Sequence, residues 1–344
     1  MSHPFAKAMR DTLDALDGSA KLLQKSLKTT DFTASNTLGT EEADVFISEV
    51  VAESVIFSNA TIWRTSKPSG QISFYDLPGY IVESVAEDTD TSNVFNPTFR
   101  RVAFATRKIR AAIDVTSESL EDNIEGPAFQ AKLMSDVIRQ VSNNFETLAW
   151  VGDSAQGGTD SYSRLIKTND GWLKQLGASS GAALVNGNGK RMSFALLDKM
   201  FAALPHKYKS PQYLSKLRWI ISWGSALALV TDGATRATNL GDQLRTTGSL
   251  PLVHGIPFLI CPLFPEDQSI SGTASLGSEV LLCDPKNLTM VMQRDISSEW
   301  ERKPRQDRWE GTLYARNDFV IMDPAGVVRA YDVSVDPAVN LYNV

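Results

Sequence analysis

The sequence is poor in the side chains that most often hold metals or form disulfides. Its 344 residues include two cysteines and three histidines. Cys261 and Cys283 form no C-x-x-C pair, and His3, His206 and His254 are far apart with no H-x-x-x-H pattern. These absences exclude a recognisable zinc or iron site and a disulfide framework. We therefore expect no metal or cofactor, and a reducing compartment.

Catalytic motifs are also missing. The sequence Gly187-Asn188-Gly189-Lys190-Arg191 fails as a phosphate loop, since Leu184 replaces its first glycine and Arg191 the required Ser or Thr. Gly177-Ala178-Ser179-Ser180-Gly181 matches G-x-S-x-G, but it lies in a stretch expected mostly as loop and not between a strand and a helix, so it is not a nucleophile elbow. No acid pair stands out. A metal-free hydrolase stays open as an alternative, but the missing nucleophile–base signature favours a structural protein.

Neither charge nor hydropathy indicates a membrane or nucleic-acid affinity of the whole chain. Lys and Arg number 34 and Asp and Glu 40, which gives a formal net charge of −6. The most apolar run, Trp219 to Val230, is broken by serine and glycine and is shorter than the ~20 residues of a membrane span. We interpret this run as buried core.

The most regular pattern that is present predicts one long helix. From Pro127 to Val151, apolar residues recur every three or four positions, and Gly152-Asp153 follows as a stop. At ~1.5 Å per residue this helix is about 37 Å long. It suits the spine of a flat, elongated domain, although a long core helix in an ordinary enzyme is the alternative.

Two helical patterns precede this helix. Apolar residues from Phe5 to Leu27 form a stripe that ends in a polar stretch, residues 28–40. This arm packs either on a partner chain or on its own domain. A second pattern between Glu41 and Ile56 carries Ala43, Phe46, Ile47, Val50 and Val51.

From Ala60 the apolar period changes to two, which predicts strands. Ile62 to Thr65 and Gln71 to Tyr75 flank a turn, and a long return strand runs to Val115. Acids gather on the outgoing side and bases on the return, which predicts an extended two-stranded ribbon. An isolated hairpin is marginally stable, so the ribbon rests on its own body or on a neighbouring subunit.

Helices early in the chain and strands late predict an α+β fold. Among the later segments, residues 193–204 are expected as a helix and residues 157–189 mostly as loop. The strip from Arg294 to Glu310 mixes charges of both signs with two tryptophans. It is either a solvated loop or a rim that contacts neighbouring subunits, where Trp and Arg are enriched.

The order of these parts resembles the major capsid proteins of tailed bacteriophages, which have the Hong Kong 97-type fold. The segments that carry the resemblance follow one another along the chain: residues 114–123, Trp150-Val151-Gly152-Asp153, Gly255-Ile256-Pro257, Cys261-Pro262-Leu263-Phe264-Pro265, Arg316-Asn317-Asp318-Phe319 and Asp323-Pro324-Ala325-Gly326. The resemblance covers the chain from about Leu38 onward.

The resemblance implies a layout in four parts. Residues 1–57 correspond to an N-terminal arm, and residues 58–113 to an extended loop that lies over the adjacent subunit. The peripheral domain with the spine helix takes residues 114–194 and 286–322. The axial domain takes residues 195–285 and 323–344, and the polar loop of residues 231–248 points at the capsomer axis.

The resemblance also implies function and partners. It indicates a protein that self-assembles as pentamers and hexamers into an icosahedral shell around double-stranded DNA, in a virion assembled in the host cytoplasm. Expected partners are a scaffolding protein, a portal, a decoration protein in some shells, and DNA bound non-specifically. The short arm indicates that scaffolding is separate or performed by the arm itself.

We expect the subunit contacts to involve two charged groups, on the ribbon and on the strip from Arg294 to Glu310, the latter at the local threefold. The candidate residues are Glu87, Asp88, Asp90, Arg100, Arg101, Arg107, Trp300, Arg302, Arg305, Arg308 and Trp309. No lysine lies between Lys67 and Lys108, so the loop has no amine for the isopeptide bond that locks some shells of this family. The alternatives are an encapsulin-type bacterial compartment, which shares the fold, and a soluble enzyme of unknown reaction.

Overall fold

The structure is a computed structural model of the full chain. It describes residues 54–76, 82, 84, 96–116, 128–234, 250–269, 276–293, 297–303 and 305–342. The expected arm helix, most of the second helical pattern between Glu41 and Ile56, and most of the polar loop of residues 231–248 lie outside these residues.

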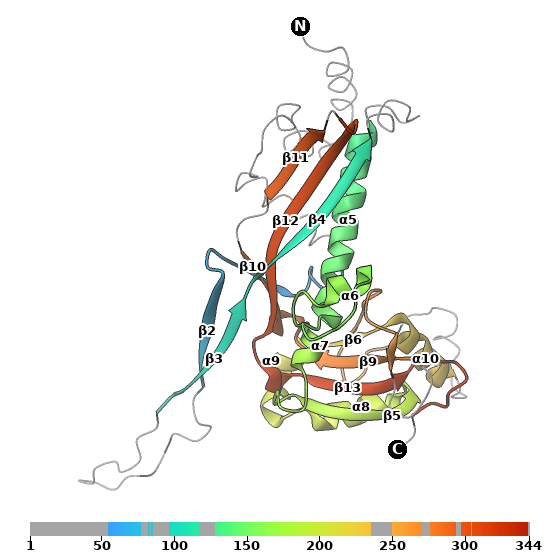
Figure 1. Ribbon diagram of the computed structural model, residues 1–344. Coiled ribbons are helices and arrows are strands. Elements are labelled where there is room, and N and C mark those ends of the chain that lie inside the picture. Colours follow the sequence, from blue (N-terminus) through green and yellow to red (C-terminus); the bar gives the residue numbers. More distant parts are fainter. Residues whose placement is uncertain are drawn as a thin grey trace, which may run out of the picture.

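The predicted spine helix is confirmed as α5, Ala128–Val151, which runs along the upper part of the molecule (Figure 1). Its apolar stripe packs into the larger core through Ile138, Phe145 and Leu148. The helix stops where two backbones meet closely. A Cβ at Gly152 would lie 2.4 Å from the carbonyl oxygen of Asn169, so only glycine fits there.

A five-stranded sheet lies against α5. Its strands are ordered β1–β10–β12–β11, and β4 pairs with β12 on the other side. One face of this sheet, which carries Ile113, Leu313 and Phe319, packs into the core with α5. The strands are β1 Thr61–Thr65, β4 Arg107–Thr116, β10 Leu288–Gln293, β11 Ser297–Lys303 and β12 Arg308–Ile321.

A six-stranded sheet forms the lower lobe in Figure 1, ordered β5–β13–β9–β6–β7 with β8 paired to β9. A second core fills the space between this sheet and helices α8 and α10. The elements are β5 Ala183–Arg191, α8 Phe194–Ala203, β6 Arg218–Ile221, α10 Trp223–Ala234, β7 Phe258–Ile260, β8 Gln268–Ser269, β9 Leu276–Cys283 and β13 Val328–Ser334.

Short helices connect these layers. α7 places Trp172 and Leu173 in the core, while α6 and β5 replace part of the loop expected over residues 157–189. The short helices are α6 Ser161–Ile166, α7 Trp172–Gln175, α9 Pro211–Leu214, η1 His206–Tyr208, η2 Pro285–Asn287 and η3 Pro324–Gly326.

One buried ion pair ties the two lobes together. Arg329 on β13 donates from Nε and Nη2 to the Glu279 carboxylate on β9, at 2.5 and 2.6 Å. Its Nη1 donates to the carbonyl oxygens of Leu173 and Leu176 at the end of α7. The guanidinium therefore joins the six-stranded sheet to a helix that packs beneath α5.

The base of the predicted two-stranded ribbon is confirmed. β2, Ser69–Asp76, on the outgoing side pairs with β3, Thr98–Ala105, on the return. β1 instead runs parallel to β10, and its Ile62 packs, partly buried, against the larger core. The two strands that flank the predicted turn therefore belong to different sheets.

The pairing of two further segments was not evident from the sequence. Of the two interpretations of the strip from Arg294 to Glu310, the irregular loop is excluded, because the described residues form the β11–β12 hairpin. β5 pairs with β13 in the six-stranded sheet. Consecutive residues can join different sheets, since pairing depends on partners distant in sequence.

Candidate interaction surfaces

The β2–β3 hairpin has one face on the body and one face in solvent. Phe104 is buried with Val291 and Val320 on the five-stranded sheet, while Ile72 and Val102 pack beside it. A Cβ at Gly70 would lie 2.8 Å from the Phe104 ring, so this glycine leaves room for the contact. The base of the ribbon thus rests on its own chain.

The opposite face carries aromatic side chains away from the body. Tyr75 and Phe99 are direct cross-strand partners, 71% and 67% exposed. Arg101, two residues further along β3, lies on the same exposed face. The hairpin projects from the molecule at the lower left (Figure 1). We call Tyr75, Phe99 and Arg101 the outer hairpin face.

Arg100 fixes the direction of the hairpin. Its guanidinium donates to Asp323 Oδ1 at 2.7 Å and to the carbonyl oxygen of Met322 at 2.5 Å, at the junction of the two lobes. Tyr208 donates to the other Asp323 oxygen. Burial alone would raise the pKa of Asp323, but these hydrogen bonds outweigh it and lower that pKa. Arg100 is therefore engaged within its own chain.

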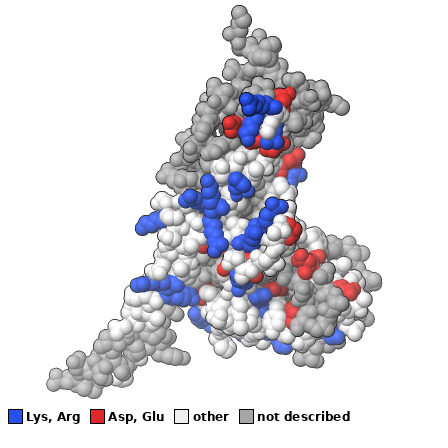
Figure 2. All heavy atoms as spheres, viewed as in Figure 1, with Lys and Arg blue, Asp and Glu red and all other residues white. Residues whose placement is uncertain are grey.

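The face of the five-stranded sheet turned away from α5 is cationic. Because Ile109 and Ala315 face the core, alternation places Lys108, Arg110 and Arg316 on the other side. The register sets Lys108 opposite Arg316, and the Lys108 Nζ lies 3.8 Å from the Tyr314 ring centre. Figure 2 shows Lys and Arg gathered over the region of β4 and β12. We call these three residues the cationic sheet face.

The far end of β12 carries paired charges. Arg308 contacts Glu310 Oε1 at 2.5 Å and Asp114 Oδ2 at 3.6 Å, and Lys303 also pairs with Glu310. These contacts join β4, β11 and β12 within one subunit. The side-chain hydrogen bonds with Lys303 and Arg308 lower the pKa of Glu310, which keeps its carboxylate charged.

The predicted contact residues are distributed over these surfaces. Arg101, Arg107 and Arg305 are exposed, whereas Arg100 and Arg308 are engaged in the chain's own ion pairs. For Trp300, Arg302 and Trp309 the structure gives the backbone register alone, with Trp300 opposite Gly311 and Arg302 opposite Trp309. Glu87, Asp88 and Asp90 lie outside the described residues.

The sequence interpretation missed Tyr75 and Phe99. Both follow from strand alternation once β2 and β3 are paired, but the sequence gives no register for that pairing, so their shared face could not be identified. Within the described ranges, no group of three or more metal-ligating side chains is found, and no helix is long and apolar enough to span a membrane. Cys261 and Cys283 are buried free thiols, and burial raises the pKa of each.

No family model matches the chain. A relative from Bacillus subtilis (strain 168), described as "Putative prophage capsid protein YqbE", is 28% identical over 253 residues, 73% of this chain and 76% of the relative. Among solved structures, the satellite phage P4 procapsid protein has a TM-score of 0.65 at 15% identity, over 89% of this chain and 94% of that chain.

A second solved structure, the encapsulin of Synechococcus elongatus PCC 7942, has a TM-score of 0.52 at 9% identity, over 96% of this chain and 99% of that chain. At these identities the structural likenesses establish the fold alone. The chain has the α+β fold of phage capsid proteins, as its resemblance in sequence implied.

Proposed function

We propose that this protein is the major capsid protein of a tailed phage or prophage. Many copies assemble into the icosahedral shell that encloses double-stranded DNA. The observation that carries this proposal is the projecting β2–β3 hairpin, whose outer face leaves Tyr75 and Phe99 without cover. Exposed aromatic side chains side by side are typical of a protein-binding surface.

In the proposed shell, Tyr75 and Phe99 are covered by a neighbouring subunit. We assign residues 1–57 to an arm and residues 58–113 to an extended loop, whose base is anchored by β1 and β4. A peripheral part holds α5 and the five-stranded sheet, and an axial part holds the six-stranded sheet. β5 belongs with the axial part, because its hydrogen-bonding partner is β13.

The turn side of the ribbon and the cationic sheet face are proposed as the two sides of one intersubunit contact. The turn side of the ribbon is acidic in sequence through Glu83, Glu87, Asp88 and Asp90. Lys108 and Arg110 on the sheet are exposed, so they suit the acids of a second copy. Complementary charge sets the register of such a contact.

A charge-reversal experiment tests this contact. Lys108→Glu with Arg110→Glu is expected to abolish particle formation, because acids would then face acids across the interface. Reversing Glu87, Asp88 and Asp90 to lysine in the same chain is expected to restore particles. Lys167→Glu, on the exposed end of α6, is the control. Normal particles from the first variant, or no rescue by the second, would overturn the pairing.

Electron microscopy of the purified protein tests the shell itself. Negative staining is expected to show particles of megadalton size. A small oligomer in size-exclusion chromatography would contradict the proposal and favour a soluble enzyme.

The likeness to an encapsulin gives a second candidate, a compartment that holds protein cargo. DNA in purified particles supports the capsid, and a co-purified protein cargo supports the compartment. The acidic net charge fits a wall that does not retain DNA site by site, because phosphate affinity comes from Lys and Arg contacts. Assembly in the host cytoplasm with separate scaffolding and portal proteins, and a possible decoration protein, completes the proposal.

The shell is expected to be held without covalent links. Because no lysine lies between Lys67 and Lys108, the loop offers no amine for an isopeptide bond. Boiled and reduced particles should run as one monomer band on a denaturing gel, and a ladder of multimers would refute this expectation.

A further inference from the structure

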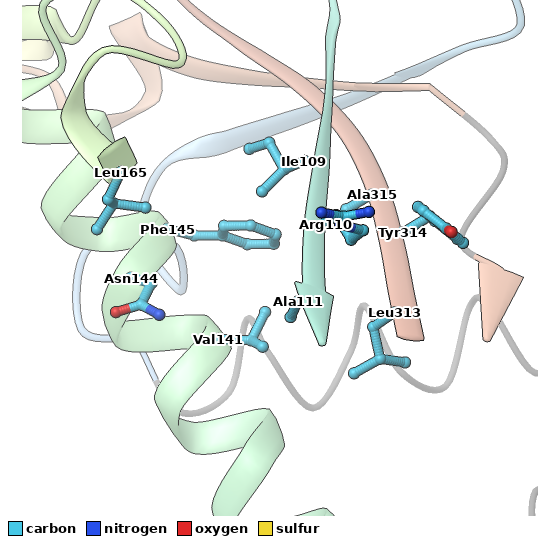
Figure 3. Close-up of a pocket in the computed structure, with 10 residues that line it drawn as sticks. All are labelled: Ile109, Arg110, Ala111, Val141, Asn144, Phe145, Leu165, Leu313, Tyr314 and Ala315. Atoms are coloured by element: carbon cyan, nitrogen blue, oxygen red, sulfur yellow. The ribbon is translucent and has the colours of Figure 1, made fainter. Parts of the chain in front are cut away.

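An apolar pocket lies between the spine helix and the five-stranded sheet. Figure 3 shows Val141 and Phe145 on α5 pointing toward β4, where Ile109 and Ala111 point back. Leu165 of α6 closes one side, and Asn144 is a polar group on the lining. The pocket volume is about 80 Å³, enough to receive part of one large apolar side chain.

Partly exposed apolar side chains extend the lining of the pocket along α5 and β4, and we call these two rows together with the pocket the apolar groove. Val137, Val141, Ile109, Ala111 and Ile113 all pack against the core but stay partly exposed. They follow one another along α5 and along the facing strand β4. An apolar seam of this kind, formed by a helix and a sheet edge, suits an extended or helical segment whose own apolar stripe runs parallel to α5.

The described chain begins at the end of this groove. Ser54 is buried, and its hydroxyl donates to Glu146 Oε2 at 2.6 Å. Glu146 is the residue after Phe145, which lines the pocket. Ile56 and Phe57 continue directly into the core. The chain that precedes Ser54 therefore leaves the body within about one helical turn of the pocket.

The preceding segment has the stripe that the groove needs. Ala43, Phe46, Ile47, Val50 and Val51 recur at helical spacing, with acids between them. Eleven residues separate Ala43 from Ser54, about 16 Å as a helix. The pocket spans residues 141–145 of α5, about 7 Å along the helix from Glu146. A helix of this length that ends at Ser54 is therefore long enough for its apolar stripe to run past the whole pocket.

We propose that residues 43–51 of the same chain lie in this groove, with one large apolar side chain of the stripe in the pocket. The fixed end at Ser54 keeps the segment at a high effective concentration beside the groove, so it outcompetes a segment from another subunit. The root of the arm is then part of its own subunit, and residues before about 40 remain for contacts with neighbours. The proposal does not depend on whether the chain forms a shell.

Disulfide trapping in the full-length chain tests the proposal. Val141→Cys is combined in turn with Phe46→Cys, Ile47→Cys and Val50→Cys, and with Ser48→Cys as the control on the polar side. The native cysteines are buried and have raised pKa values, so they do not compete under mild oxidation. At least one stripe position is expected to give an intrachain disulfide, seen as a monomer of altered mobility on a non-reducing gel.

The other outcomes overturn the proposal. Disulfide-linked dimers would place the arm of a second copy in the groove. No disulfide at any of the three stripe positions, or equal trapping at Ser48, would show that the stripe does not occupy it. Because intrachain trapping is expected in unassembled chains as well, failure to form particles leaves this result unaffected.

Measurement of Tm is a second test, which does not require the cysteine variants to fold. Phe46→Asp is expected to lower Tm by about 4 °C or more, because it places a charge against the apolar lining of the groove. Ser48→Asp, on the polar side of the same stripe, is expected to leave Tm unchanged. An equal change in Tm from the two substitutions would contradict packing of the apolar stripe in the groove.

Discussion

Two phenylalanines, Phe319 and Phe99, lie on neighbouring parts of the fold and have opposite surroundings. Phe319 on β12 is 1% exposed, stacks on Phe57 at 6.4 Å and meets the edge of Trp172 at 5.7 Å. Phe99 on β3 is 67% exposed, and its cross-strand partner Tyr75 is also exposed. Phe319 thus has its ring contacts within the subunit, whereas Phe99 and Tyr75 on the hairpin are available to another surface.

The contrast separates residues that make the fold from residues that make contacts between copies. A buried aromatic ring acts on the free energy of unfolding of the single chain. An exposed pair on a hairpin changes that free energy little, because its surroundings are similar in the folded and unfolded chain. Substitutions at Phe319, Arg329, Glu146 and Lys174 test this contrast, and their expected effect on the single subunit decreases in that order.

Phe319→Ala is expected to destabilise the unassembled chain most, by about 3–5 kcal/mol, because it leaves a cavity among Phe57 and Trp172. Phe99→Ala is the matched control and is expected to change stability by less than about 0.5 kcal/mol. Urea denaturation of the unassembled chain measures both. Under the proposed function, Phe99→Ala nevertheless reduces the yield of particles in the microscope. Equal losses of stability would remove the distinction between body and hairpin.

Arg329→Met is expected to cost about 3 kcal/mol, since it leaves the Glu279 carboxylate buried without its partner. It also removes the hydrogen bonds to Leu173 and Leu176. The double variant with Glu279→Leu should recover much of the loss, because no buried charge then remains. Denaturation curves of the three chains measure this coupling. A double variant as unstable as the single one would contradict the explanation by an unpaired charge.

Glu146→Gln is expected to change the pH dependence of stability. Burial raises the pKa of Glu146 above its usual 4.5, so the folded chain holds this proton more tightly than the unfolded chain. The protonated carboxyl favours folding at low pH, and that advantage is lost as the pH rises through the folded pKa. The variant cannot ionise, so its stability relative to the original chain should increase from pH 4.5 upward.

Denaturation at a series of pH values measures this difference. Asp136→Asn, an exposed acid on the same helix, is the control and should show no comparable trend. A stability difference for Glu146→Gln that stays constant with pH would show that the ionisation of this carboxyl is not the cause.

Lys174→Ala is expected to have the smallest effect, below about 1 kcal/mol, although Lys174 Nζ contacts both Asp153 and Asp170 at 2.6 Å. These pairs lie at the surface, where water and salt screen the attraction. Hydrogen bonding to Asp153 and Asp170 raises the pKa of Lys174, and the pKa of each aspartate is lowered. Any contribution is therefore present at neutral pH and is lost in strong alkali, where the lysine loses its proton, and in acid, where the carboxylates gain theirs. Melting temperatures at low and high salt measure it.

Local patterns in the sequence determined the elements with strong periods. The spine helix, the helix after Ser193 and the buried run beginning at Trp219 follow from residue spacing, since a helix or strand places its apolar residues on one face whatever its partners are. The order of such elements was also sufficient to predict the fold class.

The tertiary structure alone decided which strands pair and which charged groups meet. β1 joins β10, and not the nearby β2, and its Ile62 packs against the larger core. Glu146 lies in a polar gap of the helical pattern, yet it is buried, because Ser54 and the start of the core cover that side of the helix. Strand partners and buried polar groups depend on contacts between residues distant in the chain, which no local period records.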